Sequence, residues 1–344
     1  MANTTLLCVG GSNIDLFGAS FKDLIPKASN PGTIYSAPGG VMRNIVEDLG
    51  FLGSRPYFVT GLVDDEWARQ IKMSLRGKAT IIPYAKKGIP TGVYLAILDK
   101  GGDMSVSVCD NRIAEEIPYP FIAETMKRLG DTKDILIDTN LSKETIDELV
   151  ANKGSRKVYA EAVSPDKSLR LKGSLKGLYL LKCARREAIA LIGNKDLSAE
   201  VLAHLLFALG PKVVVVTDGE RGACYESSLE SGHLDPIKSN DIVNTTGCGD
   251  AVFAGLCLCL SRGLSVKASL EFGLRCAKVT IESDKATNAN LADLRVDLAT
   301  MIAVCRKAGR FEGIATTNGK EVKQWKRKAR KAVSTIIFSK KRVP

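Results

Sequence analysis

Histidine is scarce in this sequence. Only His204 and His233 are present among 344 residues, and neither lies near a candidate nucleophile. Serine hydrolases and zinc hydrolases use histidine as a base or as a metal ligand, so the sequence argues against both classes of enzyme. The nine cysteines are scattered and never form a Cys-x-x-Cys pair, which argues against a structural zinc site and against a disulfide framework.

Long apolar runs are also missing. No stretch approaches the roughly 20 apolar residues that a membrane-spanning helix needs, and the N-terminus enters an apolar segment without a basic leader. With 45% hydrophobic and 25% charged residues, the chain has the composition of a globular protein, with room for one large α/β domain or two small ones. We therefore expect a soluble, cytoplasmic protein that does not associate with membranes.

Acidic residues are nearly absent from the end of the chain, and this accounts for most of the net charge of +11. Residues 315–344 contain ten lysines and arginines and a single glutamate. Such a segment could bind RNA or an acidic partner, or be a nuclear-localisation-like signal. The interpretation that we favour is a solvated, partly disordered extension. We expect residues 1–314 to form the folded domain, followed by this basic extension.

The stretch 241–255 has the pattern of an anion-binding corner. A short apolar strand is expected to run into a turn spaced by Gly247 and Gly249, and then into an apolar helix. Glycines allow successive N–H groups to point at one site where the helix also begins, and a phosphate fits such a site. Asp250, in the first helical turn, could accept a proton from a substrate hydroxyl beside that phosphate. The alternative is an ordinary helix start that Asp250 caps.

Two further segments combine glycines with polar side chains. The residues before Asn13 are expected to form a strand that ends in two glycines, so Asn13 and Asp15 would lie at the strand end where open α/β sheets bind ligands. A polar turn without function is the alternative there. Gly39 and Gly40 open an amphipathic helix and would make a second corner of close approach, with Asn44 one turn further on.

The remaining pattern predicts a large, mostly parallel sheet and a small additional one. Buried strands that alternate with helix-like stretches indicate a doubly wound α/β fold. These strands are expected at 134–138, 157–161, 178–181 and 213–217. Residues 93–98 and 104–108 flank a glycine-rich turn and predict a hairpin, which could form a small sheet with residues 16–35.

Residues 244–255 resemble the C-terminal signature of the ribokinase (PfkB) family of sugar and nucleoside kinases, although Asn244 and Cys248 replace the usual Asp and Ala. Residues 39–53 resemble the N-terminal signature of that family, in the form Gly-Gly-Val-x-Arg-Asn-Ile-x-Glu that is closest to the pseudouridine kinases. The resemblance covers roughly residues 5–310. It implies a ribokinase-like three-layer fold with a central, mostly parallel sheet and a small β lid, formed from about 16–36 and 88–110.

The resemblance also implies a reaction, which is transfer of the γ-phosphoryl group of ATP to the 5′-hydroxyl of pseudouridine. Asp250 would act as the general base, and the positioned N–H donors around it would stabilise charge on the transferred phosphoryl group. The residues that would supply these N–H groups are Gly247, Cys248 and Gly249. The residues implied in substrate binding are Asn13, Asp15, Gly39, Gly40, Asn44 and Thr91.

On the nucleotide side, the resemblance implies that Glu187 holds Mg²⁺ through water and that a monovalent cation such as K⁺ lies near residues 274–290. The residues implied in nucleotide binding are Glu187, Thr217, Gly219, Gly222 and Asn288. Ala184 departs from the family, which usually has asparagine there, so we expect weaker handling of Mg²⁺ or phosphate. The lid could also pair two copies into a homodimer through exposed strand edges.

Two other functions stay open from the sequence. The acceptor could be another ribonucleoside or a sugar, because residues that bind ribose do not identify the base. The chain could also be a catalytically weak, kinase-like interaction protein that uses its basic tail. Ala184 and the tail motivate this second alternative, whereas Asp250 and both glycine corners argue against it.

Overall fold

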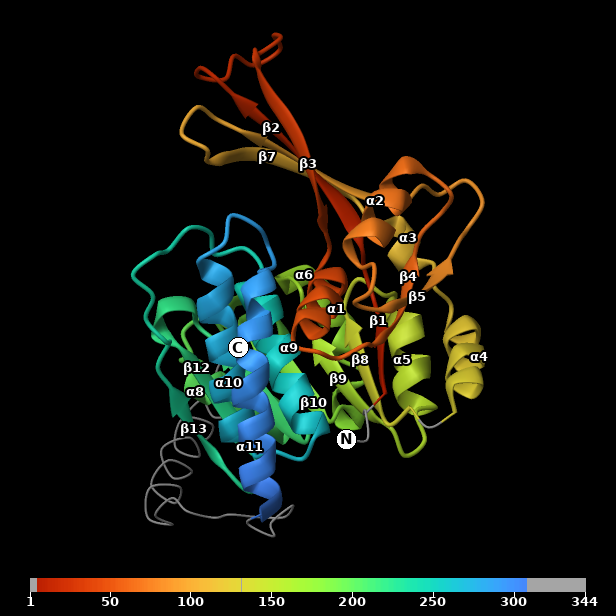
Figure 1. Cartoon of the computed structure of the whole chain (residues 1–344), viewed down its shortest axis with the longest axis vertical. Coiled ribbons are helices and arrows are strands. Elements are labelled where there is room, and N and C mark those ends of the chain that lie inside the picture. The colour runs from red at the N-terminus through yellow and green to blue at the C-terminus, as the bar shows by residue number, and fades with distance from the viewer. Residues whose placement is uncertain (1–4, 131, 308–344) are drawn as a thin grey trace, which may run out of the picture.

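The computed structural model describes residues 5–130 and 132–307, which form two sheets with helices around the larger one (Figure 1). The larger sheet has nine strands in the order β13-β12-β11-β10-β9-β8-β1-β4-β5. These are β1 (Leu6–Val9), β4 (Tyr57–Gly61), β5 (Thr80–Tyr84), β8 (Asp134–Asp138), β9 (Lys157–Glu161), β10 (Leu180–Ala184), β11 (Val213–Thr217), β12 (Ala223–Ser227) and β13 (Ser231–Leu234). The smaller sheet has four strands in the order β3-β2-β6-β7. These are β2 (Asn13–Ser20), β3 (Gly32–Gly39), β6 (Gly92–Leu98) and β7 (Met104–Asp110).

Helices cover both faces of the larger sheet, as the alternation of buried side chains along its strands requires. Leu6 and Cys8 enter one hydrophobic core with α1, α9, α10 and α11, whereas Leu7 and Val9 enter the other with α4, α5, α7 and α8. The helices are α1 (Val41–Phe51), α2 (Glu66–Ser74), α3 (Arg112–Glu115), α4 (Tyr119–Leu129), α5 (Lys143–Ala151), α6 (Pro165–Ser168), α7 (Arg185–Ile192), α8 (Ala199–Ala208), α9 (Cys248–Ser261), α10 (Val266–Ile281) and α11 (Arg295–Lys307), with four short 3₁₀ turns η1 (Leu169–Leu171), η2 (Leu175–Gly177), η3 (Gly219–Arg221) and η4 (Ala289–Leu294). The predicted three-layer α/β fold is confirmed.

The larger sheet is parallel from β5 to β11, and only β12 and β13 run antiparallel to their neighbours. The carboxyl ends of the parallel strands therefore meet at one edge of the sheet, where ligands bind in open α/β folds. The first turn of α1 reaches this edge, because Met42 N–H donates to the Asp138 carboxylate at the end of β8, at 3.1 Å.

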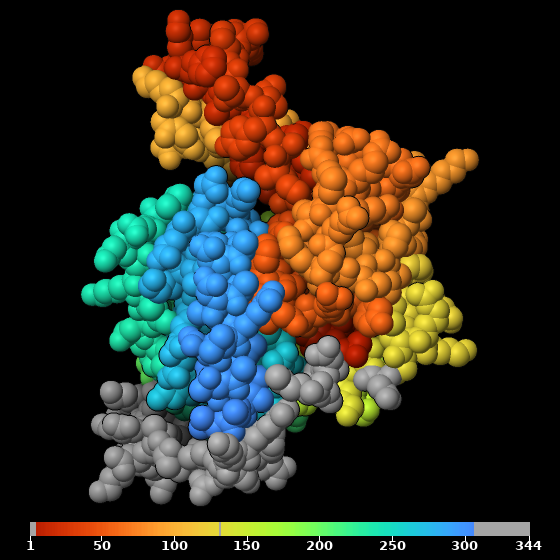
Figure 2. Space-filling model, in the orientation of Figure 1, coloured from red at the N-terminus to blue at the C-terminus, as the bar shows by residue number. Residues whose placement is uncertain are grey.

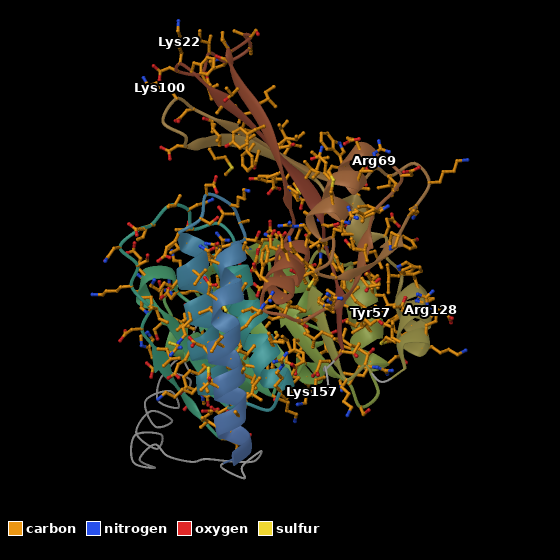
Figure 3. The ribbon with its side chains drawn as sticks, in the orientation of Figure 1. Lys22, Tyr57, Arg69, Lys100, Arg128 and Lys157 are labelled. Carbon is orange, nitrogen blue, oxygen red and sulfur yellow. The ribbon has the colours of Figure 1, made fainter. Side chains whose placement is uncertain are left out.

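The smaller sheet projects from the body of the molecule, and open space separates its outer part from the helices (Figure 2). It is built from the segments that the sequence predicts for a lid: β2 pairs antiparallel with β3 and parallel with β6, and β6 pairs with β7 as a hairpin. Lys22 and Lys100 lie at its far tip (Figure 3), where Lys100 Nζ contacts Asp23 Oδ2 at 2.8 Å. We call this sheet the lid.

One predicted element is wrong, and two expectations fall outside the described residues. The segment before Gly247 is not a strand: the N–H groups of Val243 and Asn244 both donate to the Ile281 carbonyl, at 2.9 and 3.2 Å, instead of joining a ladder. The basic extension 315–344, and with it the division of the chain at 314, lies outside the described residues. Within 5–130 and 132–307, no helix is long and apolar enough to cross a membrane.

Candidate functional site

A buried carboxylate organises the N-terminal half of the site. Asp138 accepts hydrogen bonds from Gly11 N–H at 3.1 Å and from Met42 N–H at 3.1 Å, and from both the backbone and the side-chain nitrogen of Asn140 at 2.9 Å. Burial raises the pKa of Asp138, and the bonds from Asn140 and Gly11 oppose that rise. This single side chain holds the end of β1 and the start of α1 together, and we assigned it no role from the sequence.

Asp15 lies at the base of the lid, where only a glycine can face it. Asn13 Nδ2 donates to Asp15 Oδ1 at 2.5 Å. A Cβ atom on Gly39 would lie 2.2 Å from Asp15 Oδ2, so any larger residue there would displace the carboxylate. Burial raises the pKa of Asp15 to about 6, against the opposing effects of Asn13 and Arg43. The structure thus brings three predicted substrate-binding residues, Asn13, Asp15 and Gly39, into one cluster.

The start of α9 forms the glycine corner that the sequence predicts around Gly247. Gly247 has a φ of 83°, and a Cβ atom there would lie 1.8 Å from the Ala286 carbonyl oxygen, so both conformation and space require glycine. No acceptor for Gly249 N–H is found among the described residues, whereas Cys248 N–H donates weakly to the Thr245 carbonyl at 3.3 Å. Burial raises the pKa of Cys248 to about 11, so its thiol is neutral at physiological pH.

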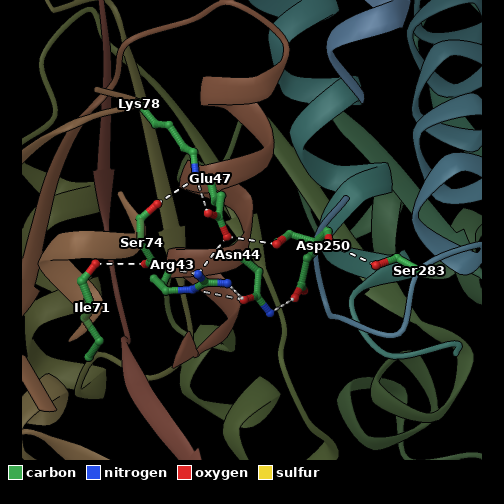
Figure 4. Close-up of polar contacts among 9 residues, drawn as sticks. Arg43, Asn44, Glu47, Ile71, Ser74, Lys78, Asp250 and Ser283 are labelled. Carbon is green, nitrogen blue, oxygen red and sulfur yellow. Dashed lines mark hydrogen bonds and ion pairs between the residues drawn. The ribbon is translucent and has the colours of Figure 1, made fainter. Parts of the chain in front are cut away.

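The two corners meet through Asp250 and Asn44. Asn44 Nδ2 donates to Asp250 Oδ2 at 2.8 Å, although 206 residues separate them in the chain (Figure 4). Burial raises the pKa of Asp250 to about 6, and Asp138 adds to the rise, whereas Asn44, Lys182 and Arg43 oppose it. Asp250 is therefore a carboxylate that is ionised at neutral pH but more basic than an ordinary aspartate. That property suits a general base.

A buried ion pair lies beside the start of α9, and it was not predicted from the sequence. Lys182 Nζ contacts Glu161 Oε1 at 2.9 Å, and the same Nζ would lie 3.1 Å from a Cβ atom on Gly249. Burial opposes the charge on Lys182, but Glu161 outweighs that effect and raises the pKa of Lys182, so the ammonium is retained. The only signal in the sequence was a lysine inside an otherwise apolar strand, two residues before Ala184.

The predicted nucleotide-side residues are spread along neighbouring strand ends. Glu187 is buried in the first turn of α7, where its Oε2 accepts from Ala184 N–H at 2.6 Å. Thr217 ends β11, which neighbours β10, and Gly219 and Gly222 form the turn into β12. Asn288 is used structurally, because its Oδ1 caps η4 and its Nδ2 donates to the Val279 carbonyl at 2.6 Å.

Thr91 does not fit the expected contact with the base of a substrate. Its side chain is fully buried, and its Oγ1 accepts from Val63 N–H at 3.2 Å. Its own N–H donates to Asp65 Oδ2 at 3.1 Å. These bonds join the start of β6 to the turn before α2, so Thr91 supports the hinge of the lid.

Comparison with known proteins identifies the family of the chain. The family described as pfkB family carbohydrate kinase matches residues 3–293. The chain belongs to this family. It is therefore a kinase that transfers a phosphoryl group to an alcohol acceptor, with a sugar or nucleoside as substrate, and family membership implies ATP as the donor.

Two curated relatives and one solved structure illustrate the range of this kinase family. The chain is 30% identical over 299 residues to pseudouridine kinase from Escherichia coli K12, covering 83% of this chain and 93% of the relative. It is 35% identical over 268 residues to cytidine kinase from Thermococcus kodakarensis, covering 73% and 90%. Arabidopsis thaliana ribokinase complexed with ribose and ATP shares the fold, with a TM-score of 0.73, 18% identity, and coverage of 86% and 98%.

Proposed function

We propose that this kinase phosphorylates the 5′-hydroxyl of pseudouridine with ATP, giving pseudouridine 5′-phosphate, and that Asp250 is the general base. The observation that carries the proposal is the state of the Asp250 carboxylate. Its Oδ2 is held by Asn44, whereas no donor for Oδ1 is found among the described residues. One oxygen is thus fixed and the other is free to take the proton of an acceptor hydroxyl.

The surrounding residues support the same assignment. Asp15 and Asn13 would bind ribose hydroxyls at the base of the lid, beside the glycine corner formed by Gly39 and Gly40. Closure of the lid over them would exclude water and limit hydrolysis of ATP. The transferred phosphoryl group would lie at the start of α9, where the Gly249 N–H, the weakly bonded Cys248 N–H and the nearby Lys182 ammonium would stabilise negative charge.

The described residues fit magnesium carried by the nucleotide. They contain no group of three or more His, Cys, Asp or Glu side chains that could hold a metal alone. Magnesium would therefore take phosphate and water ligands, with Glu187 accepting hydrogen bonds from its waters. Glu187 accepts from Ala184 N–H at 2.6 Å and Arg186 Nε at 3.4 Å, which leaves lone pairs of the carboxylate available. When bound, the metal neutralises charge on the phosphates.

The choice of pseudouridine rests on the Gly-Gly-Val-x-Arg-Asn signature and on the relative from E. coli. A second candidate is another ribonucleoside, which the 35% identity to a cytidine kinase favours. Both candidates would use the same ribose contacts and the same general base, Asp250. They differ only in how the nucleobase is recognised.

We also propose that a second copy of the chain covers the outer face of the lid. The strand register places Leu16, Leu95 and Val108 on one face, and Asp15 on the opposite, inner face. The outer face carries Ile34, Val106 and Val108 at 83%, 56% and 64% exposure, and neighbouring exposed apolar side chains of this kind mark interaction surfaces. Analytical ultracentrifugation should show a dimer, and Val106→Lys should shift the protein to a monomer. A monomer at micromolar concentration would contradict this proposal.

An assay of ATP-dependent phosphorylation tests the proposed function. The panel is pseudouridine, uridine, cytidine, adenosine, ribose and fructose, each with Mg²⁺ and with or without K⁺. We expect the highest kcat/KM for pseudouridine. Preference for another nucleoside would keep the mechanism and replace the substrate, whereas no turnover with intact ATP binding would favour the interaction-protein alternative. Deleting residues 315–344 would then test whether the basic tail binds RNA or an acidic partner, through loss of salt-sensitive affinity.

A further inference from the structure

Arg43 is a buried cation in α1, directly before the asparagine that holds Asp250. Its Nη2 and Nε donate to Asn44 Oδ1 at 2.6 and 3.2 Å, and its side chain is only 3% exposed. A guanidinium has donors and no acceptor, so it can face only the carbonyl oxygen of the amide. The amide nitrogen must then point away from Arg43, toward Asp250 Oδ2 (Figure 4).

A second set of contacts holds Arg43 itself. Arg43 Nη1 donates to Glu47 Oε2 at 2.7 Å and to Ser74 Oγ at 3.3 Å. Glu47 also accepts from Lys78 Nζ and from Thr287 Oγ1, the latter at 2.8 Å. Burial would raise the pKa of Glu47, but Arg43, Lys78 and Thr287 outweigh burial and hold that pKa below its usual value. The anchor for Arg43 is therefore an ionised carboxylate bound from three sides.

We propose that Arg43 is a positioning residue for phosphoryl transfer, which orients the Asn44 amide so that Asp250 presents its free oxygen to the acceptor hydroxyl. This inference rests on the proposed role of Asp250 as base. Without Arg43 the Asn44 amide could rotate, and its carbonyl would then meet the carboxylate oxygen of Asp250 with no proton between them. The Asp250 side chain would leave its position, and the acceptor hydroxyl would lose an aligned base.

A purely structural role predicts different behaviour. An ion pair that only stabilises α1 needs the contact from Nη1 to Glu47, which a lysine can also make. The contact with Asn44 uses the other two nitrogens at the same time, and a single ammonium group cannot reproduce that fork. Arg43→Lys therefore separates the two roles, because it keeps the charge and the ion pair while it removes the control of the amide.

The experiment compares Arg43→Lys and Arg43→Met with a matched control, Arg69→Lys. Arg69 lies on α2 with its side chain 61% exposed and pairs with Glu66 outside the site. We expect Arg43→Lys to fold, to keep its KM values for ATP and nucleoside, and to lose about 10–100-fold in kcat, which is the scale of a misplaced catalytic group. The control should match wild type.

The pH profile separates the charge of Arg43 from its control of the Asn44 amide, because the charge acts on the pKa of Asp250 whereas the orientation of the amide acts on kcat. The charged and titratable groups that influence or face Asp250 are Arg43 and Asp48 from α1, Asp138 from β8, Glu161 from β9, Lys182 from β10, and Cys248 from α9. Arg43→Met removes a positive charge, so the acid limb of kcat should move to higher pH. Arg43→Lys retains the charge, so the limb should stay in place while kcat falls.

A folded Arg43→Lys enzyme with wild-type kcat would overturn the proposal, and this holds even if Arg43→Met fails to fold. A wild-type kcat and acid limb in folded Arg43→Met would overturn it as well. Asp250→Asn, measured in parallel, separates this failure from failure of the proposed base. If Asp250→Asn retains turnover, the base assignment is wrong. If Asp250→Asn is inactive and Arg43→Lys is normal, only the inference about Arg43 is wrong.

Discussion

Replacing Asp250 by asparagine removes the proposed base with little change of shape. The new side-chain oxygen can still accept the hydrogen bond from Asn44 Nδ2, which measures 2.8 Å in the structure. The amide cannot take up the proton of the acceptor hydroxyl. We expect kcat to fall about 10²–10⁴-fold, or about 3–5 kcal/mol in activation free energy, while ATP binding persists.

The raised pKa of Asp250 sets the pH at which wild-type activity is lost. Burial raises that pKa from 3.8 to about 6, and the base must be ionised to accept a proton. Turnover should therefore fall as the pH drops through about 6, two units above the value for an ordinary aspartate. Asp250→Asn should lack this limb, because its side chain does not titrate.

The raised pKa of Asp250 also affects folding stability, which should decrease as the pH rises, whereas activity should increase. A carboxyl whose folded pKa lies above its unfolded pKa binds its proton more tightly in the folded state, so the free energy of unfolding decreases as the pH rises from about 4 to about 6. Above that window, ionised Asp250 costs stability. Asp250→Asn should be more stable than wild type at pH 7.5, and the difference should vanish near pH 4, as urea titrations at both values would show.

Asp241→Asn is the matched control. It makes the same chemical change outside the site, at an exposed residue that precedes the same helix. It should leave kcat and stability unchanged. Near-normal turnover in folded Asp250→Asn would refute the assignment of the base. If the turnover of the wild-type enzyme fell only near pH 4, the environment of Asp250 would not raise its pKa. That result would refute the electrostatic part of the prediction.

Three further substitutions test the corners and the metal side. Gly247→Ala should cost clearly more unfolding free energy than Gly88→Ala, because both glycines have positive φ but a Cβ atom meets open space only at Gly88; equal losses in urea titrations would show that the clash is relieved. Gly39→Ala should raise the KM for nucleoside, because its Cβ atom would displace the Asp15 carboxylate, whereas Gly18→Ala in the same sheet should leave KM unchanged; equal KM values would contradict the proposed role of Asp15 in binding the substrate. Ala184→Asn should lower the Mg²⁺ concentration for half-maximal activity and cap α7, adding about 0.5–2 kcal/mol; an unchanged titration would show that the departure is already compensated.

Local sequence patterns were sufficient to predict most of the strands, helices and glycine turns. The strand and helix assignments rest on periodicity, which side chains impose on their own segment, and the run Val213–Thr217 forms β11 as predicted. Glycine corners are also local, because a positive φ or a missing Cβ is a property of one residue. Asp250 was identifiable for this reason: it follows Gly247 and Gly249 at a helix start. The prediction of a strand at the apolar pair Ile242 and Val243 was wrong, because a short apolar run does not determine whether a neighbouring strand is available for pairing.

The partners of these residues were decided by the tertiary structure. Local periodicity says nothing about which strand lies beside which, and the sheet order places β10 so that Lys182 lies beside Gly249. The packing of α1 and α9 on one face of that sheet brings Asn44 to Asp250 across 206 residues. The sequence therefore determined the chemical groups and the turns that present them, whereas contacts between distant segments, which set the pKa of Asp250 and the orientation of Asn44, came from how helices and strands pack.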